Sequence, residues 1–183
     1  MEHYYRKIKG FFDFENIYRK AIKDFPSGSH FVEIGCWRGT STCFMAVEII
    51  NSGKQITFDC VDLWDYSGEE YERDDLFPEK KKVYENFLTN IKPVKQVVRH
   101  HKMDSVEASK LFKDGSLDFI YIDASHSFVN VVFDLWAWYP KLRWGGLIAG
   151  HDYDFPEVKA AVDGFFLKKK IETLTRSWMY YKN

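Results

Sequence analysis

Carboxylate and imidazole side chains follow two apolar runs of the sequence, at the points where these runs end. Residues 119–122 lead into Asp123 and, three positions later, His126, and residues 146–150 lead into His151 and Asp152. Carboxylates and imidazoles together can hold a divalent cation, with magnesium or manganese favoured where oxygen ligands predominate. The pattern predicts a metal site made of Asp123, His151 and Asp152. His126 is the predicted general base, because an unperturbed histidine has a pKa near ~6.5, and Asp123 is assigned to the catalytic centre with it.

A structural interpretation of the same residues stays open. An aspartate at the end of a parallel strand often caps the following turn, and a histidine in such a turn can be a satisfied structural residue. Three roles are open to His151, which can coordinate the cation, orient a substrate or pack.

The segment 31–41, Phe-Val-Glu-Ile-Gly-Cys-Trp-Arg-Gly-Thr-Ser, combines a buried strand, a glycine turn and the start of a helix. The first turn of a helix presents free N–H groups and a partial positive charge, which suit a carboxylate or a phosphate. A dinucleotide site would have G-x-G-x-x-G here, but Trp37 replaces the central glycine and would crowd a pyrophosphate. The G-x-x-x-x-G-K-[ST] pattern of nucleoside triphosphate sites is also missing. A ligand that carries a nucleoside and a carboxylate remains.

Two further acids follow predicted strands. Asp62 comes directly after an apolar run, where an acid can accept hydrogen bonds from a ribose diol. Asp104, followed by Ser105, precedes a predicted helix and can accept from the exocyclic amine of adenine. Capping of that helix by Asp104 or Ser105 is the alternative.

The bulk composition points to one compact domain and a small partner. The 183 residues are 45% apolar and 18% aromatic, enough for a substantial core. With 26 basic and 27 acidic side chains, the charge balance argues against a nucleic-acid groove or a polybasic membrane surface. No apolar run has the length of a membrane span, and the N-terminus lacks the core of a secretion signal, so we expect a cytoplasmic protein. The three cysteines are expected to be free buried thiols.

Strands and helices alternate along the predicted chain. Strands are expected at 30–34, 55–61, 96–100, 117–122, 146–149 and 172–180, and helices at 14–25, 40–51, 105–111, 129–139 and 157–166. Apolar strands in this alternation predict a doubly wound, mainly parallel α/β sheet with helices on both faces, and ligands bind at the carboxyl ends of such strands.

The expected organisation is an N-terminal helical segment, residues 1–29, followed by a ligand-binding domain, residues 30–183. Residues 64–90 form a polar insertion with an acidic cluster and three consecutive lysines. This insertion is predicted either as a lid over the strand ends or as a solvated surface helix.

The ordered set formed by residues 32–39, Asp62 and Asp104-Ser105 resembles a class I S-adenosylmethionine-dependent methyltransferase with a Rossmann-like fold, over about residues 30–166. The resemblance implies that Glu33 and Gly35 shape the methionine site, that Asp62 holds the ribose and that Asp104 meets the adenine. The full set of implied cosubstrate contacts is Glu33, Gly35, Trp37, Gly39, Thr40, Ser41, Asp62, Leu63, Asp104, Ser105 and Asp123.

The strand ends at Asp123-His126 and His151-Asp152 are similar to a narrower group, the metal-dependent O-methyltransferases of sugars, macrolides and catechols. That group places a metal-binding aspartate three residues before a histidine or lysine base, and usually two adjacent oxygen ligands at the next strand end. His151 departs from this pattern, so Asp152 is the better ligand candidate. The resemblance implies metal-assisted methylation of a hydroxyl on a sugar or small natural product, with S-adenosylmethionine, a magnesium or manganese ion and a possible homodimer.

Two other functions stay open from the sequence. Cephalosporin-hydroxylase-like sequences share the Asp-Ala-x-His ending, which leaves an oxidoreductase on the same fold as one alternative. A non-catalytic domain that only binds a nucleoside is the other.

Overall fold

A seven-stranded sheet forms the centre of the protein, as seen in a computed structural model that describes residues 1–65, 82–167 and 169–183. The strand order is β3-β2-β1-β4-β5-β7-β6, and β1 to β5 run parallel while β7 is antiparallel to both its neighbours. The strands are β1 His30–Ile34, β2 Thr57–Asp62, β3 Val98–Lys102, β4 Leu117–Ile122, β5 Leu142–Gly150, β6 Glu172–Leu174 and β7 Ser177–Tyr181. This confirms the predicted Rossmann-like, mainly parallel α/β fold.

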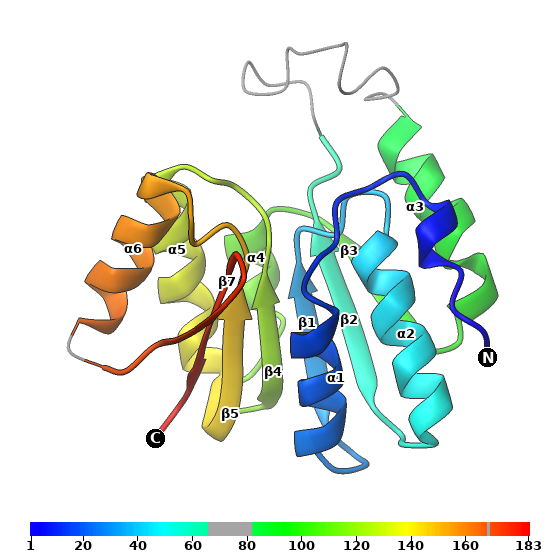
Figure 1. Cartoon of the computed structure of the whole chain (residues 1–183), viewed down its shortest axis with the longest axis horizontal. Helices are drawn as coiled ribbons and strands as arrows, with labels where there is room; N and C mark the ends of the chain where they lie inside the picture. The colour runs from blue at the N-terminus through cyan, green and yellow to red at the C-terminus, as the bar shows by residue number, and fades with distance from the viewer. Residues whose placement is uncertain (66–81, 168) are drawn as a thin grey trace.

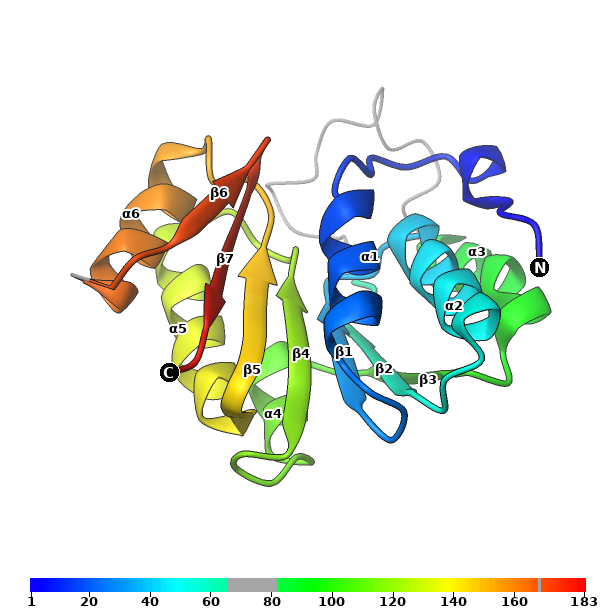
Figure 2. The same ribbon diagram turned by 60° about the horizontal axis from the view of Figure 1, so that its bottom comes forward.

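Helices cover both faces of the sheet (Figures 1 and 2). One face carries α1 Glu15–Asp24, α2 Thr40–Ser52 and α3 Val83–Ile91, and the other carries α4 Ser105–Ser109, α5 Phe128–Trp138 and α6 Pro156–Phe166. Short 3-10 turns lie at Tyr5–Lys7, Lys92–Val94 and Tyr139–Lys141. Because successive strand side chains point to opposite faces, the core divides into two layers. Phe31 belongs to the layer under α1 and α2, and its neighbour Val32 to the layer under α5.

The strand order reverses between β1 and β4, which lie side by side at the centre of the sheet. Ligands of open α/β sheets bind outside the carboxyl ends of the strands at such a point. The two chains are close there, because the amide of Asp123 donates to the carbonyl of Ile34 at 2.7 Å. Gly35 follows at φ +84°, and a Cβ on it would lie 2.0 Å from the carbonyl oxygen of Asp123. Only glycine fits this position.

One predicted element is wrong at the C-terminus. The single strand expected at 172–180 is a hairpin in which β6 and β7 pair antiparallel. Thr175, at φ +53°, and Arg176 form the turn between them. The run contains no glycine or proline to mark a turn, so the sequence did not indicate this one.

The predicted insertion 64–90 is described only at its two ends. Residues 66–81 lie outside the described residues, and with them most of the proposed lid. Residues 83–91 form α3, and Phe87 of this helix packs against Trp64, with ring centroids 4.4 Å apart. None of the helices in the described part of the chain combines the length and apolar character that a membrane crossing needs.

Candidate functional site

The loop after β1 is held by the carboxylate of Asp62, at the end of β2. One oxygen, Oδ2, accepts the amides of Cys36 and Trp37, both at 2.8 Å, and Oδ1 accepts the amide of Trp64 at 2.6 Å. Trp37 takes a left-handed conformation, with φ +44°. Its carbonyl accepts the indole N–H of Trp64 at 2.7 Å. Asp62 therefore fixes the shape of both strand-end loops from a buried position.

A first cavity of about 290 Å³ lies on the α5 side of this loop. It brings together seven of the predicted cosubstrate residues: Gly35, Trp37, Asp62, Leu63, Asp104, Ser105 and Asp123. The wall also contains Asn130, Phe133 and Asp134 from α5.

A second cavity of about 320 Å³ lies on the other side of the loop. Predicted residues in its wall are Thr40, Ser41, His126, His151 and Asp152. Aromatic rings of Phe11, Trp37 and Phe155 line it as well, and Phe11 and Trp37 stack in parallel with centroids 6.2 Å apart. The two cavities share Gly35, Trp37, Asp123 and Ala124, which places Asp123 at their junction.

Two predicted cosubstrate residues line neither of these cavities. Glu33 is buried beneath the loop, where it accepts from Tyr18 of α1 at 2.8 Å and from Thr42 of α2. It thereby ties both helices to β1. Gly39 is the N-cap of α2 at φ +83° and packs against Phe87.

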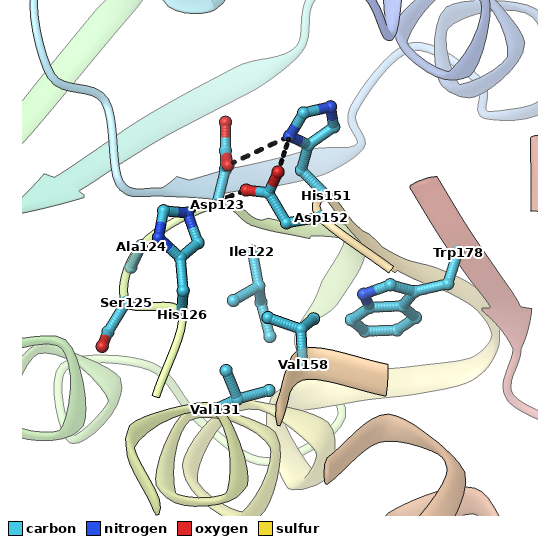
Figure 3. Close-up of a pocket in the computed structure, with 10 residues that line it drawn as sticks. All are labelled: Ile122, Asp123, Ala124, Ser125, His126, Val131, His151, Asp152, Val158 and Trp178. Atoms are coloured by element: carbon cyan, nitrogen blue, oxygen red, sulfur yellow. Dashed lines mark ion pairs between the residues drawn. The ribbon is translucent and has the colours of Figure 1, made fainter. Parts of the chain in front are cut away.

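Asp123, His151 and Asp152 converge at the ends of β4 and β5, as predicted (Figure 3). His151 Nδ1 lies 3.7 Å from Asp123 Oδ1 and 3.2 Å from Asp152 Oδ1. On the other side of the ring, Nε2 lies 2.7 Å from Oδ1 of Asp13, which comes from the segment before α1. Figure 3 shows these polar groups above an apolar floor formed by Ile122, Val131, Val158 and Trp178.

Two further side chains pair with Asp152 in addition to His151. His126 Nε2 lies 2.8 Å from Oδ2, and Arg176 Nη2 donates to Oδ1 at 2.7 Å. The imidazole of His126 stacks on Phe155, with centroids 5.0 Å apart and planes 8° from parallel. Residue 152 itself is held at φ +54°. The carboxylate is thus surrounded by three positively charged or chargeable groups.

The two carboxylates of this cluster, Asp123 and Asp152, have pKa values shifted in opposite directions. Burial raises the pKa of Asp123 to about 7, although the charge of His151 acts against the rise. Burial also acts to raise the pKa of Asp152, but hydrogen bonds from His126 and His151 hold it well below its usual range. For His151 burial favours the neutral ring, yet Asp152 and Asp123 overcome this and raise its pKa to about 9.

The donor set fits a divalent cation. An ion about 2.1 Å from each of its ligands separates them by about 3 Å, close to the donor separations around His151 Nδ1. Metal-binding histidines usually donate their second ring N–H to a carboxylate, and Asp13 occupies that position on Nε2. Arg176 is the opposing feature, since its charge lies against one of the ligand carboxylates.

Residues 32–153 match a protein family described as a methyltransferase domain, Methyltransf_24. The chain belongs to this family. It is a methyltransferase, and the family implies S-adenosylmethionine as the cosubstrate. The match decides against the hydroxylase-like alternative. No curated protein matches the sequence of this methyltransferase.

Solved structures share the fold of this methyltransferase at low sequence identity. The O-methyltransferase NovP aligns with a TM-score of 0.64 and 16% identity, over 92% of this chain and 79% of NovP. The TDP-rhamnose 3'-O-methyltransferase CalS11, from calicheamicin biosynthesis, aligns with a TM-score of 0.60 and 13% identity, over 91% of this chain and 76% of CalS11. TrmN from Thermus thermophilus aligns with a TM-score of 0.61 and 14% identity, over 92% of this chain and 49% of TrmN. At these identities the likeness shows the fold alone.

Sequence reasoning missed several residues that line the site of this methyltransferase. Asp13 and Phe11 come from the N-terminal segment, Arg176 from the unpredicted hairpin turn, and Asp134 from the middle of a helix. None of them lies at the end of a parallel strand, the signal that identified the others. Asp134 offered one usable signal, as an acid inside an otherwise apolar helical stretch.

Proposed function

We propose that this methyltransferase transfers the methyl group of S-adenosylmethionine to a hydroxyl of a sugar or small natural product, with assistance from a divalent cation. The observation that carries the proposal is the position of Asp123 at the junction of the two cavities. A donor in one cavity and an acceptor in the other would meet beside the cluster of Asp123, His151 and Asp152. Alignment of this kind is the main requirement of a displacement on an activated sulfonium.

The first cavity suits the cosubstrate. Asp62 and Leu63 lie where the ribose would bind, and Asp104 and Ser105 where the adenine would bind. The methionine carboxylate would lie across the shared wall at Gly35, where Thr40 and Ser41 of the second cavity begin the thirteen-residue helix α2, whose N-terminal N–H groups suit an anion. None of the described side chains that line this cavity is basic, and five are aspartates, which favours a ligand that carries a sulfonium and amino groups.

Asp123, His151 and Asp152 would hold the cation. A bound cation lowers the pKa of a coordinated hydroxyl and fixes its position. Asp13 accepts from Nε2 of His151, which keeps Nδ1 directed at the two carboxylates. The sequence left three roles open for His151: packing, orienting a substrate or coordinating the cation. We propose that it coordinates the cation.

His126 would accept the proton of the acceptor hydroxyl. Asp152 binds its Nε2, which assigns proton acceptance to Nδ1 and stabilises the imidazolium that results. Stacking on Phe155 fixes the plane of the ring. The side chain is 54% exposed and lines the second cavity, so it faces the side on which the acceptor binds.

The second cavity supports a cyclic acceptor with several hydroxyls. Phe11, Trp37 and Phe155 provide flat apolar surfaces, and His126 and Arg176 provide polar groups between them. Pockets of this kind bind the faces of a ring by apolar contact and orient it with a few polar groups. The TDP-rhamnose acceptor named for CalS11 is consistent with this choice.

The test is calorimetric titration followed by an assay. Wild-type protein should bind S-adenosylmethionine and its demethylated product, and it should methylate members of a sugar and phenol library only with magnesium or manganese present. Methylation that is unaffected by chelation would remove the cation from the proposal, and failure to bind either nucleoside would overturn the proposal as a whole.

A further inference from the structure

A buried aspartate, Asp134, lies in the wall of the first cavity. Asp134 lies in the second turn of α5 and is 5% exposed, among the apolar residues Val131, Leu135 and Trp138 of the same helix. Asp134 lines the cavity together with Asp104 and Ser105. No basic side chain of the described residues lines this cavity, so the charge of Asp134 has no protein counter-ion there. A buried acid without a counter-ion is costly unless something donates to it.

The neighbouring hydroxyl is oriented toward this carboxyl group. Trp138, four residues further along α5, donates its indole N–H to Ser105 Oγ at 2.8 Å. Since Oγ accepts that bond, the Ser105 proton is directed elsewhere, and it stabilises the ionised form of Asp134. Burial outweighs this effect and raises the pKa of Asp134 to about 6. A carboxylate offers about four acceptor positions, so the bond from Ser105 leaves acceptor capacity for a ligand.

Asp104, the acid first expected to meet adenine, is less suited to that role. Its Oδ1 accepts the amide of Glu107 at 3.0 Å and caps α4, and the residue is exposed. A hydrogen bond to an exposed carboxylate competes with water, whereas one to a desolvated carboxyl group discriminates strongly between ligands. Of the two acids beside Ser105, Asp134 is therefore the better candidate to recognise the base by a hydrogen bond.

We infer that Asp134 determines base specificity by accepting a hydrogen bond from the 6-amino group of the cosubstrate's adenine. The inference rests on the proposed position of S-adenosylmethionine in the first cavity and adds a residue to it. A hypoxanthine base carries a carbonyl oxygen in place of the amino group, so it would direct an acceptor at an acceptor. Asp134 would exclude it.

The experiment is a titration of S-adenosylhomocysteine and S-inosylhomocysteine into wild type and three variants. Wild type should prefer the adenine ligand by about 10- to 100-fold, the worth of one hydrogen bond to a buried charged group. In Asp134→Leu the affinity for S-adenosylhomocysteine should fall by this factor, and the preference over S-inosylhomocysteine should vanish. Asp134→Asn offers an amide N–H to the hypoxanthine oxygen and should narrow the preference. Asp104→Ser is the matched control, because serine keeps the helix cap while removing the carboxylate, and it should keep the preference.

Two results would overturn the inference alone: an unchanged preference in Asp134→Leu, or loss of the preference in Asp104→Ser. If Asp134→Leu does not fold, Asp134→Asn decides, since an unchanged ratio of the two affinities in that variant contradicts the inference. Absence of binding of S-adenosylhomocysteine to wild type would instead overturn the cosubstrate assignment and the inference with it.

Discussion

His126 and Asp152 are paired, with Nε2 of the ring 2.8 Å from Oδ2 of the carboxylate. The two residues come from the ends of neighbouring parallel strands, β4 and β5, and the pair faces the second cavity. A carboxylate on one ring nitrogen fixes the tautomer and supports proton uptake at the other. The pair connects the proposed base to the proposed metal ligands.

Replacement of His126 by Gln should lower turnover by about 10²- to 10⁴-fold, the usual contribution of general-base catalysis. Affinity for S-adenosylhomocysteine should stay unchanged, because His126 lines the second cavity and not the first. Steady-state kinetics and calorimetry measure the two effects. The control is His100→Gln, on an exposed histidine of β3 that contacts Tyr84 at 3.1 Å. Equal turnover in His126→Gln and wild type would remove His126 from the mechanism.

Asp123→Asn and Asp152→Asn should change stability in opposite directions at neutral pH. Burial raises the pKa of Asp123 from 3.8 to about 7, so its ionisation costs folding stability progressively between these values. Asparagine removes that cost, and the gain should grow as the pH rises from about 4 to 7. Asp152 has a lowered pKa, so its stabilisation is present above its usual pKa of 3.8 and is lost only in stronger acid.

Urea unfolding of both variants across this pH range tests the two predictions, because it measures the free energy of unfolding. Asp152→Asn should lose about 2 kcal/mol of unfolding free energy at pH 5 and pH 7 alike, a value reduced for the exposure of His126 and Arg176. A loss of stability in Asp123→Asn that grows with pH would contradict the assignment of the raised pKa.

The sequence predicted the part of this site that depends on the sheet. Parallel strands bring their carboxyl ends to one edge, so Asp123, His151 and Asp152 could be grouped from position alone. Asp13 and Arg176 could not, because they reach the cluster from the N-terminal segment and from the turn of the β6–β7 hairpin. Their place depends on packing between elements that are distant in sequence.

The strands show the same difference between features that the sequence pattern predicts and features that depend on packing. Apolar runs bounded by polar residues marked β1, β2 and β4, which are buried on both faces, whereas the edge strand β3 is exposed over most of its length. At β5 the prediction began at residue 146, whereas the strand begins at Leu142. Exposed Trp144 and Gly145, at φ +74°, interrupt the apolar pattern beside an irregular register. The strand continues across them because β4 supplies the hydrogen-bonding partners on either side.

Arg176→Gln should bind manganese about tenfold more tightly than wild type. The guanidinium donates to Asp152 Oδ1 at 2.7 Å, so its charge repels a cation bound to the same carboxylate, with a strength reduced by solvent at 40% exposure. Electron paramagnetic resonance titration of manganese measures the affinity independently of turnover. Arg143→Gln is the matched control, since Arg143 is 39% exposed and pairs with Asp118 at 2.6 Å. Weaker manganese binding in Arg176→Gln would show that the arginine supports the site.

Asp62→Asn should lower both thermal stability and affinity for S-adenosylhomocysteine. Asp62 accepts three backbone amides, and asparagine directs an N–H group at one or two of these donors. The loop that carries Gly35 and Trp37 then loses its anchor, and with it the shape of the wall shared by both cavities. The affinity measured by calorimetry and the melting temperature measured by thermal unfolding should both fall. Asp118→Asn, which leaves one acceptor oxygen for the two donors His30 N and Arg143 Nε, should lower stability while leaving nucleoside affinity intact. If Asp62→Asn loses affinity at unchanged stability, the residue acts on the ribose alone and the loop is held by other contacts.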